Sequence, residues 1–140
     1  MKDCIFCKII MGDIPGHVLY EDENVLVFMD ISQTTKGHTL VVPKVHRRDI
    51  YEMNAQEIQQ VFSIVPKISA ALRDAFDCKG LNIVNNNGAP AGQTVFHFHV
   101  HLIPRYDDDD FRIRFINHMD KYDNYALTKL KNKIISNMGA

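Results

Sequence analysis

The residues of this 140-residue chain that could do chemistry begin with its histidines, and three of the seven alternate strictly at His97, His99 and His101. Alternation with apolar residues is typical of a β-strand that has one polar and one apolar face. The imidazoles would line one face, and the other would turn to the core with Phe96, Phe98, Val100 and Leu102. Neutral imidazole is a good nucleophile near neutral pH. The row therefore favours attack on phosphorus, in which a labile phospho-imidazole divides one difficult step into two easier ones.

Two other interpretations of the histidine row are an edge strand with solvated histidines and a metal site with several histidine ligands. An extended strand would separate His97 from His101 by about 13 Å. That distance is too long for all three imidazoles to bind one tetrahedral ion. Attack on phosphorus would also need donors that hold the phosphate oxygens. The segment before the row offers such donors in Asn86, the backbone N–H groups of residues 88–92, Gln93 and Thr94.

The cysteines provide a second group, because two of the three form the pair Cys4-x-x-Cys7. This pair is half of a structural zinc site, which needs two further ligands. It could instead be a redox pair, although no thioredoxin-like βαβ pattern surrounds it. Spacing alone does not select the missing ligands among the seven histidines. The third cysteine, Cys78, has no assigned role.

The composition is that of an ordinary globular domain, with 46% hydrophobic and 24% charged residues and a net charge of -1. A charge so close to zero argues against nucleic acid or an anionic membrane as a partner. No apolar run approaches the ~18 residues of a membrane span, and the first four residues do not resemble the start of a signal peptide. We therefore expect one cytoplasmic domain that spans residues 1–140.

Strands and helices must position these groups. Apolar runs bounded by turn residues predict strands over 17–20, 25–29, 39–42 and 81–85, and the histidine strand follows and stops at Pro104. A short helix is expected over residues 5–11. Asn54 and Glu57 form a capping-box pattern at the start of a long helix that reaches Phe76, with Pro66 expected to kink it. The irregular order of strands and helices favours an antiparallel α+β domain.

The last 35 residues differ from the rest of the chain. Residues 107–110 are four consecutive aspartates, which we expect to form a solvated loop rather than a metal site. Apolar residues recur at helical spacing over residues 124–138, which predicts a helix that packs on another surface.

Several segments together resemble the histidine triad (HIT) family. The run from His97 to Ile103 is similar to the family signature His-x-His-x-His-x-x, in which x is hydrophobic. Residues 4–10, 22–32, 37–44 and 86–101 also resemble family segments, in the same order and at the same spacing. The resemblance covers residues 4–106 as a core, leaves 107–140 as a C-terminal extension, and is strongest to the bacterial Hint-like branch. It implies a five-stranded antiparallel sheet with one long helix and short N- and C-terminal helices.

The resemblance also implies roles for individual residues. His99 would be the nucleophile that becomes nucleotidylated, and His101 would contact the phosphate and assist the leaving group. His97 would lie beside His38 in a network that supports the site. Asn86, Gln93 and the hydroxyl of Thr94 would contact phosphate, and Asp30 would bind the ribose hydroxyls. The apolar pocket for the purine would include Ile5, Phe6, Ile9, Ile14, Phe28 and Ile31.

A metal site and an activity follow from the same resemblance. Bacterial members with this cysteine pair complete a structural zinc site with the residues that correspond to His46 and His97, so one zinc per chain would be held by Cys4, Cys7, His46 and His97. The implied activity is hydrolysis of purine nucleoside phosphoramidates at the α-phosphorus. Alternatives are hydrolysis of dinucleoside polyphosphates and a nucleotide-binding scaffold whose hydrolysis is incidental. Family members commonly form homodimers, and the C-terminal extension would influence the choice of leaving group.

Overall fold

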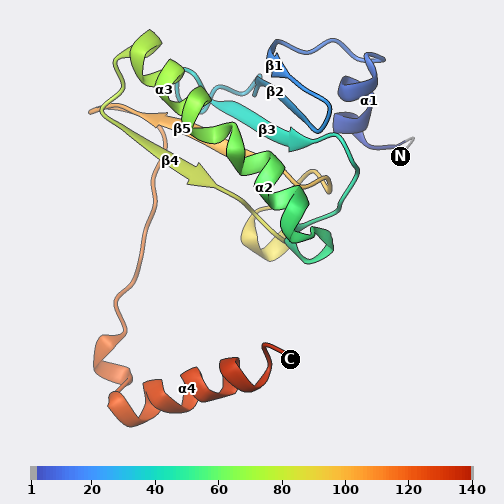
Figure 1. The fold of residues 1–140 in the computed structure, drawn as a ribbon. Helices are drawn as coiled ribbons and strands as arrows, with labels where there is room; N and C mark the ends of the chain where they lie inside the picture. Colours follow the sequence, from blue (N-terminus) through green and yellow to red (C-terminus); the bar gives the residue numbers. More distant parts are fainter. Residues whose placement is uncertain (1–2, 140) are drawn as a thin grey trace.

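A computed structural model describes residues 3–139, so Met1, Lys2 and Ala140 of the expected domain lie outside the description (Figure 1). Its centre is one five-stranded sheet in the order β1-β2-β3-β5-β4, with every neighbouring pair antiparallel. The strands are β1 (Val18–Glu21), β2 (Val25–Met29), β3 (Thr39–Pro43), β4 (Gly80–Val84) and β5 (Val100–Arg105). The predicted α+β fold with a five-stranded antiparallel sheet is confirmed.

The predicted long helix is present but is divided into α2 (Ala55–Ser63) and α3 (Val65–Phe76). Asn54 and Glu57 form the expected capping box at the start of α2. The break falls at Ile64, two residues before Pro66. Proline has no N–H to donate to the preceding turn, but it is tolerated in the first turn of a helix. The chain therefore starts a new helix at this point, and the two helices cross the same face of the sheet (Figure 1).

Both faces of the central strands are covered, which explains their nearly continuous apolar sequences. The face under α2 and α3 buries Val27, Val41, Phe98, Val100 and Leu102 against residues of those helices. On the opposite face, α1 (Ile5–Met11) packs its Phe6 on the alternate residues Leu26, Phe28, Leu40 and Val42. His101 pairs with Leu40, so it lies on the same side of the sheet as α1.

The histidine strand is shorter than predicted, because β5 begins only at Val100. Before it, the N–H of Phe98 donates to the carbonyl of Arg47 in the loop after β3, at 2.6 Å. The prediction that Phe96 faces the core is wrong, since 38% of this residue is exposed and its ring lies under the guanidinium of Arg48. Pro104 does not end the strand. It lies where β5 pairs with β4 alone, and such a position tolerates a missing N–H.

The C-terminal region leaves the sheet and ends in α4 (Asn124–Ser136), which lies far from the other elements (Figure 1). No residue of α4 is buried, so the expected packing of this helix does not occur within residues 3–139. Residues 107–110 form the expected loop with Asp107, Asp108 and Asp110 exposed, but the side chain of Asp109 is only 5% exposed and is bound to Arg105. No helix among residues 3–139 is long and apolar enough to span a membrane.

Candidate active site and metal centre

His99 lies immediately before β5 and has one ring nitrogen already engaged. Its Nδ1 is 2.7 Å from the carbonyl oxygen of His97, which can only accept, so Nδ1 carries the proton. The other nitrogen, Nε2, therefore has a free lone pair. The ring of Phe6 packs edge-on against the imidazole with centroids 5.0 Å apart. Burial lowers the pKa of His99, which keeps the ring neutral and nucleophilic near neutral pH.

His101 is hydrogen-bonded to a second histidine. Its Nδ1 lies 2.9 Å from Nε2 of His38, and a carboxylate oxygen of Asp30 lies 3.6 Å from that same Nε2. The Nδ1 of His38 is buried and has no partner among the described residues. Orphaned buried N–H groups are rarer than orphaned acceptors, so the proton of His38 belongs on Nε2 and donates to His101. Because Nδ1 of His101 accepts this hydrogen bond, the proton of the neutral His101 ring lies on its Nε2.

The neighbouring imidazoles of His99 and His101 are therefore chemically complementary. Their ring centroids lie 4.9 Å apart, and His99 offers a bare Nε2 while His101 offers an N–H at its Nε2. The hydrogen bond also corrects one expectation, because His38 is paired with His101 and not with His97. The register explains this. His101 lies opposite Leu40, so it is the diagonal neighbour of His38 on the same face of the sheet.

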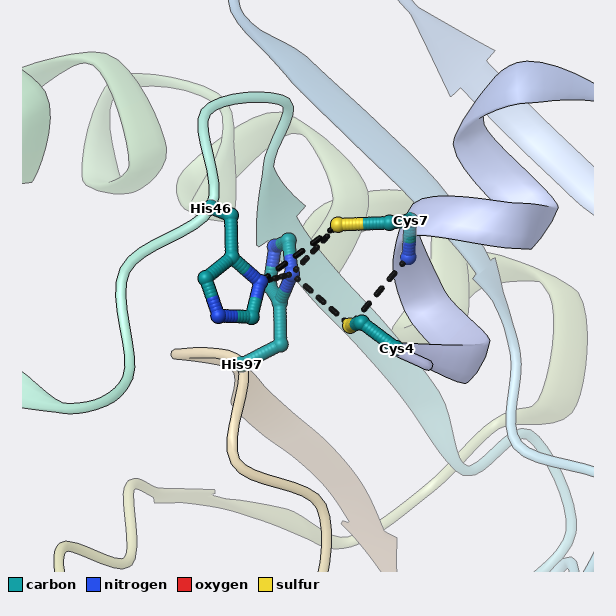
Figure 2. A group of neighbouring side chains, drawn as sticks. All are labelled: Cys4, Cys7, His46 and His97. Carbon is teal, nitrogen blue, oxygen red and sulfur yellow. Dashed lines mark hydrogen bonds between the residues drawn. The ribbon is translucent and has the colours of Figure 1, made fainter. Parts of the chain in front are cut away.

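A second cluster joins Cys4, Cys7, His46 and His97, as Figure 2 shows. Nδ1 of His97 lies 3.4 Å from the sulfur of Cys4 and 3.5 Å from that of Cys7. Nδ1 of His46 lies 3.4 Å from the sulfur of Cys7 and 3.2 Å from Nδ1 of His97. Cys4 is the N-cap of α1 and Cys7 lies within that helix, while His46 lies in the loop after β3 and His97 on the approach to β5. The fold thus assembles the four expected metal ligands.

The geometry of this cluster fits a tetrahedral metal ion. Bonds of 2.0–2.3 Å from zinc to nitrogen and sulfur place neighbouring ligand atoms about 3.3–3.8 Å apart, close to the observed distances. Nε2 of His97 lies 2.8 Å from the carbonyl of Pro43, so it carries the proton and leaves Nδ1 free to bind a cation. Burial raises the pKa of the Cys7 thiol. A thiolate there consequently needs a compensating positive charge.

An apolar pocket of about 270 Å³ lies between α1 and the end of β2. It contains all six residues expected around a purine, which are Ile5, Phe6, Ile9, Ile14, Phe28 and Ile31. Asp30 also lines it, and Ile31 is 89% exposed at its rim. Burial opposes ionisation of Asp30, but hydrogen bonds from the N–H and hydroxyl of Ser32 outweigh it and lower the pKa of this carboxyl.

The three expected phosphate contacts are placed differently from one another. Asn86 lines a pocket that also contains His38 and His101. Gln93 is buried, and its amide is used by the backbone: its oxygen accepts from Gly88, and its nitrogen donates to two carbonyls. Thr94 is exposed in a depression beside Cys4 and His46. Only Asn86 is thus brought to the histidine pair, whereas Gln93 holds the preceding loop in shape.

The comparison with known proteins identifies the family. A family model described as "HIT domain" matches residues 11–108. The chain belongs to this family. It is 50% identical over 140 residues to "Protein hit" of Bacillus subtilis, covering 99% of this chain and 97% of that protein. It also resembles the crystal structure of a HIT family member from B. subtilis, with a TM-score of 0.96, 50% identity and 99% of each chain covered.

More distant HIT relatives bear on the two clusters. A Zn-bound histidine triad family protein from Mycobacterium smegmatis matches with a TM-score of 0.75 and 35% identity, over 94% of this chain and 98% of that one. The adenosine 5'-monophosphoramidase hnt1 of Schizosaccharomyces pombe is 39% identical over 106 residues, or 76% of this chain and 77% of that protein. A metal and nucleotide hydrolysis are therefore both found among HIT proteins similar to this one.

The structure also reveals two contributors that were not predicted from the sequence. Asn85 donates from its side-chain amide to the carbonyl of His99 at 2.9 Å, which fixes the backbone of that histidine. Phe111 lines the pocket of His101 and Asn86, although it lies beyond the resemblance to the family core. A run of three asparagines at 85–87 was a visible signal for the first. No local pattern marks the second.

Proposed function

We propose that this HIT protein hydrolyses purine nucleoside phosphoramidates at the α-phosphorus. The proposal rests chiefly on the bare Nε2 of the buried His99 beside His101, whose Nε2 carries a proton. His99 attacks phosphorus and forms a nitrogen–phosphorus bond while the bond to the leaving amine breaks. The amine departs with the proton that Nε2 of His101 donates. Water then bonds to phosphorus through its oxygen as the bond to His99 breaks, and one proton of the water returns to Nε2 of His101. The nucleoside monophosphate is released, and both histidines are restored.

The surrounding residues support binding of the nucleoside and its phosphate. The purine occupies the apolar pocket of Phe6, Phe28 and Ile31, and the ionised carboxylate of Asp30 at its rim accepts hydrogen bonds from the ribose hydroxyls. Asn86 donates to a phosphate oxygen from the pocket that it shares with His101. The monophosphoramidase relative from S. pombe acts on the same class of bond, which favours this substrate class.

The test of this proposal is the variant His99→Asn, which removes the nucleophile and keeps a side chain of similar size. With adenosine 5'-phosphoramidate, kcat should fall at least ~1000-fold, because loss of a covalent nucleophile has effects of this size or larger. His118→Asn, in the exposed segment before α4, is the matched control and should retain wild-type kcat. Equal turnover by the two variants would show that His99 is not the nucleophile.

We further propose that zinc occupies the cluster of Cys4, Cys7, His46 and His97. Four protein ligands leave no open position, so the metal would act as a cross-link and would not take part in the reaction. It would join α1, which forms a wall of the purine pocket, to the segment that leads into His99.

All three cysteines are free thiols in the described chain. Reduced thiols are typical of the cytoplasm, where we place the protein.

We also propose that the protein is a homodimer in which helix α4 packs on a second copy. The helix exposes apolar side chains, among them Leu127, Leu130 and Ile134. Residues 111–140 carry six basic and two acidic side chains, whereas the preceding part carries ten basic and fifteen acidic ones. The region that contains α4 and the body of a second copy are thus complementary in charge. Sedimentation equilibrium should give twice the 16.1 kDa of the chain, and a mass of one chain would contradict the dimer.

A further inference from the structure

The pocket that contains His101 lies on the opposite side of the histidines from the purine pocket. The purine pocket is lined from β2 and β3 by Phe28 and Leu40. The second pocket, of about 150 Å³, is lined from β4 and β5 by Val84, His101 and Ile103, and also by Thr34, His38, Asn86 and Phe111. In the strand order β1-β2-β3-β5-β4, a substrate that starts in the first pocket crosses the histidines before it reaches the second.

We propose that the second pocket receives the leaving group, and that Phe111 is the residue that determines which leaving groups are accepted. This inference rests on the proposed phosphoramidase activity. Three of the lining side chains, those of Val84, Ile103 and Phe111, are apolar, and those of Thr34 and Asn86 are neutral and polar. The pocket is smaller than the one for the purine. Its chemistry suits a compact amine with an apolar body, such as a benzylic amine, better than a second nucleoside.

Phe111 is held in place by an extensive set of contacts. Arg105 donates from Nε and Nη2 to the two carboxylate oxygens of Asp109, at 3.0 and 3.1 Å, and from Nη2 to the carbonyl of Phe111 at 2.7 Å. Its guanidinium lies 5.0 Å from the centroid of the Phe111 ring. Asp109 also accepts from the N–H groups of Tyr106 and Phe111. The wall is therefore preformed and does not depend on a ligand to order it.

The facing wall is equally constrained. The side-chain amide of Gln33 donates to the carbonyls of Asp30 and His38 and accepts from the N–H of Gly37. These bonds fix the loop that presents Thr34. The hydroxyl of Tyr106 donates to the carbonyl of Lys36 at 2.7 Å, which ties this loop to the segment that leads to Phe111. The two walls thus keep a fixed separation, which is the property that a size-selective pocket needs.

A second aromatic residue, which lies outside α4, provides a matched control. Phe115 follows Phe111 by four residues but is 90% exposed and lines none of the pockets at the histidines. Replacement of either phenylalanine by alanine removes the same atoms from the same segment. Any difference between the two variants therefore reports the pocket and not the loss of an aromatic ring in general.

The experiment compares kcat/KM for adenosine 5'-phosphoramidate, which releases ammonia, with kcat/KM for its N-benzyl derivative. Phe111→Ala should lower the value for the benzyl compound about tenfold and the value for the ammonia compound less than about threefold. Phe115→Ala should change neither. Phe111→Leu, which keeps an apolar wall, should fall between wild type and Phe111→Ala for the benzyl compound. Equal losses on both substrates, or equal behaviour of the two alanine variants, would overturn the role of Phe111.

The same measurements separate this inference from the proposed function. If the wild-type protein hydrolyses neither compound, the phosphoramidase activity fails, and the leaving-group pocket fails with it. If the wild-type protein hydrolyses both and Phe111→Ala does not discriminate between them, the activity stands and only the assignment of the pocket is lost. Thermal unfolding of Phe111→Ala and Phe111→Leu shows whether a general loss arises from unfolding.

Discussion

Two clusters that contain histidine lie on either side of His99, and they use the imidazole side chain for different purposes: one to bind a metal and the other to place a proton. The metal cluster is Cys4, Cys7, His46 and His97, and the proton cluster is Asp30, His38 and His101. In the metal cluster the two Nδ1 atoms lie 3.2 Å apart, with sulfur atoms at 3.4–3.5 Å. In the proton cluster two ring nitrogens lie 2.9 Å apart, the ordinary length of one hydrogen bond.

Burial does not explain the difference, because it lowers the pKa of both His97 and His101 to about 4. The difference comes instead from the ring nitrogen that points away from each cluster, which is Nε2 in His97 and Nδ1 in His38. Nε2 of His97 donates to the carbonyl of Pro43, so its Nδ1 faces the sulfur atoms without a proton. Nδ1 of His38 has no partner among the described residues, so its proton lies on Nε2 and points at His101. The partner of one nitrogen thus decides what the other can bind.

The largest effect is expected from removal of a ligand in the metal cluster. Cys7→Ser should lose bound zinc and lower the free energy of unfolding by about 2–4 kcal/mol, because metal binding contributes directly to folding. Elemental analysis and urea unfolding would measure the two quantities. Cys78→Ser is the matched control, since Cys78 lies outside the cluster. Zinc at one equivalent in Cys7→Ser would contradict the assignment.

A smaller effect, confined to catalysis, is expected in the proton cluster. His38→Ala removes the donor that sets the tautomer of His101, so kcat for adenosine 5'-phosphoramidate should fall about 10–100-fold. KM and zinc content should stay near wild type, because His38 does not touch the metal cluster. His118→Ala controls for the loss of an imidazole. Loss of zinc in His38→Ala would show that the two clusters are not independent of each other.

The smallest effect is a change in the pH dependence of stability. The pKa of His101 is lowered to about 4, while an unfolded histidine has a pKa of ~6.5. The unfolded chain thus binds the proton first as pH falls, so the contribution of neutral His101 is complete above pH ~6.5 and is lost toward pH 4. The stability difference between wild type and His101→Asn should decrease over that window, by on the order of 1 kcal/mol given the partial exposure of the ring. A difference that is constant from pH 7 to pH 5 in urea unfolding would contradict this shift.

Much of the fold was predictable because local patterns carried it. The helix over residues 5–11, the strand over 25–29 and the capping box at Asn54 and Glu57 all agree with the structure. The errors occurred where contacts distant in sequence prevail over local pattern. Alternation around Phe98 predicted a strand, but its backbone bonds to Arg47 instead. Four consecutive aspartates predicted a solvated loop, which holds for three of them, but Arg105 binds Asp109.

The sequence by itself determined the inventory of the two clusters: a cysteine pair on one helical turn, alternating histidines on one face and a resemblance that named four metal ligands. The tertiary structure decided which histidine serves which cluster. Alternation shows that His97, His99 and His101 share a face, but it does not show which strand lies beside them. The pairing of His101 with Leu40 brings His38 to His101, and the packing of α1 brings both cysteines to His97. Phe111 reaches the second pocket only through the contacts of Arg105 and Asp109, because its position depends on ion pairing and not on periodicity.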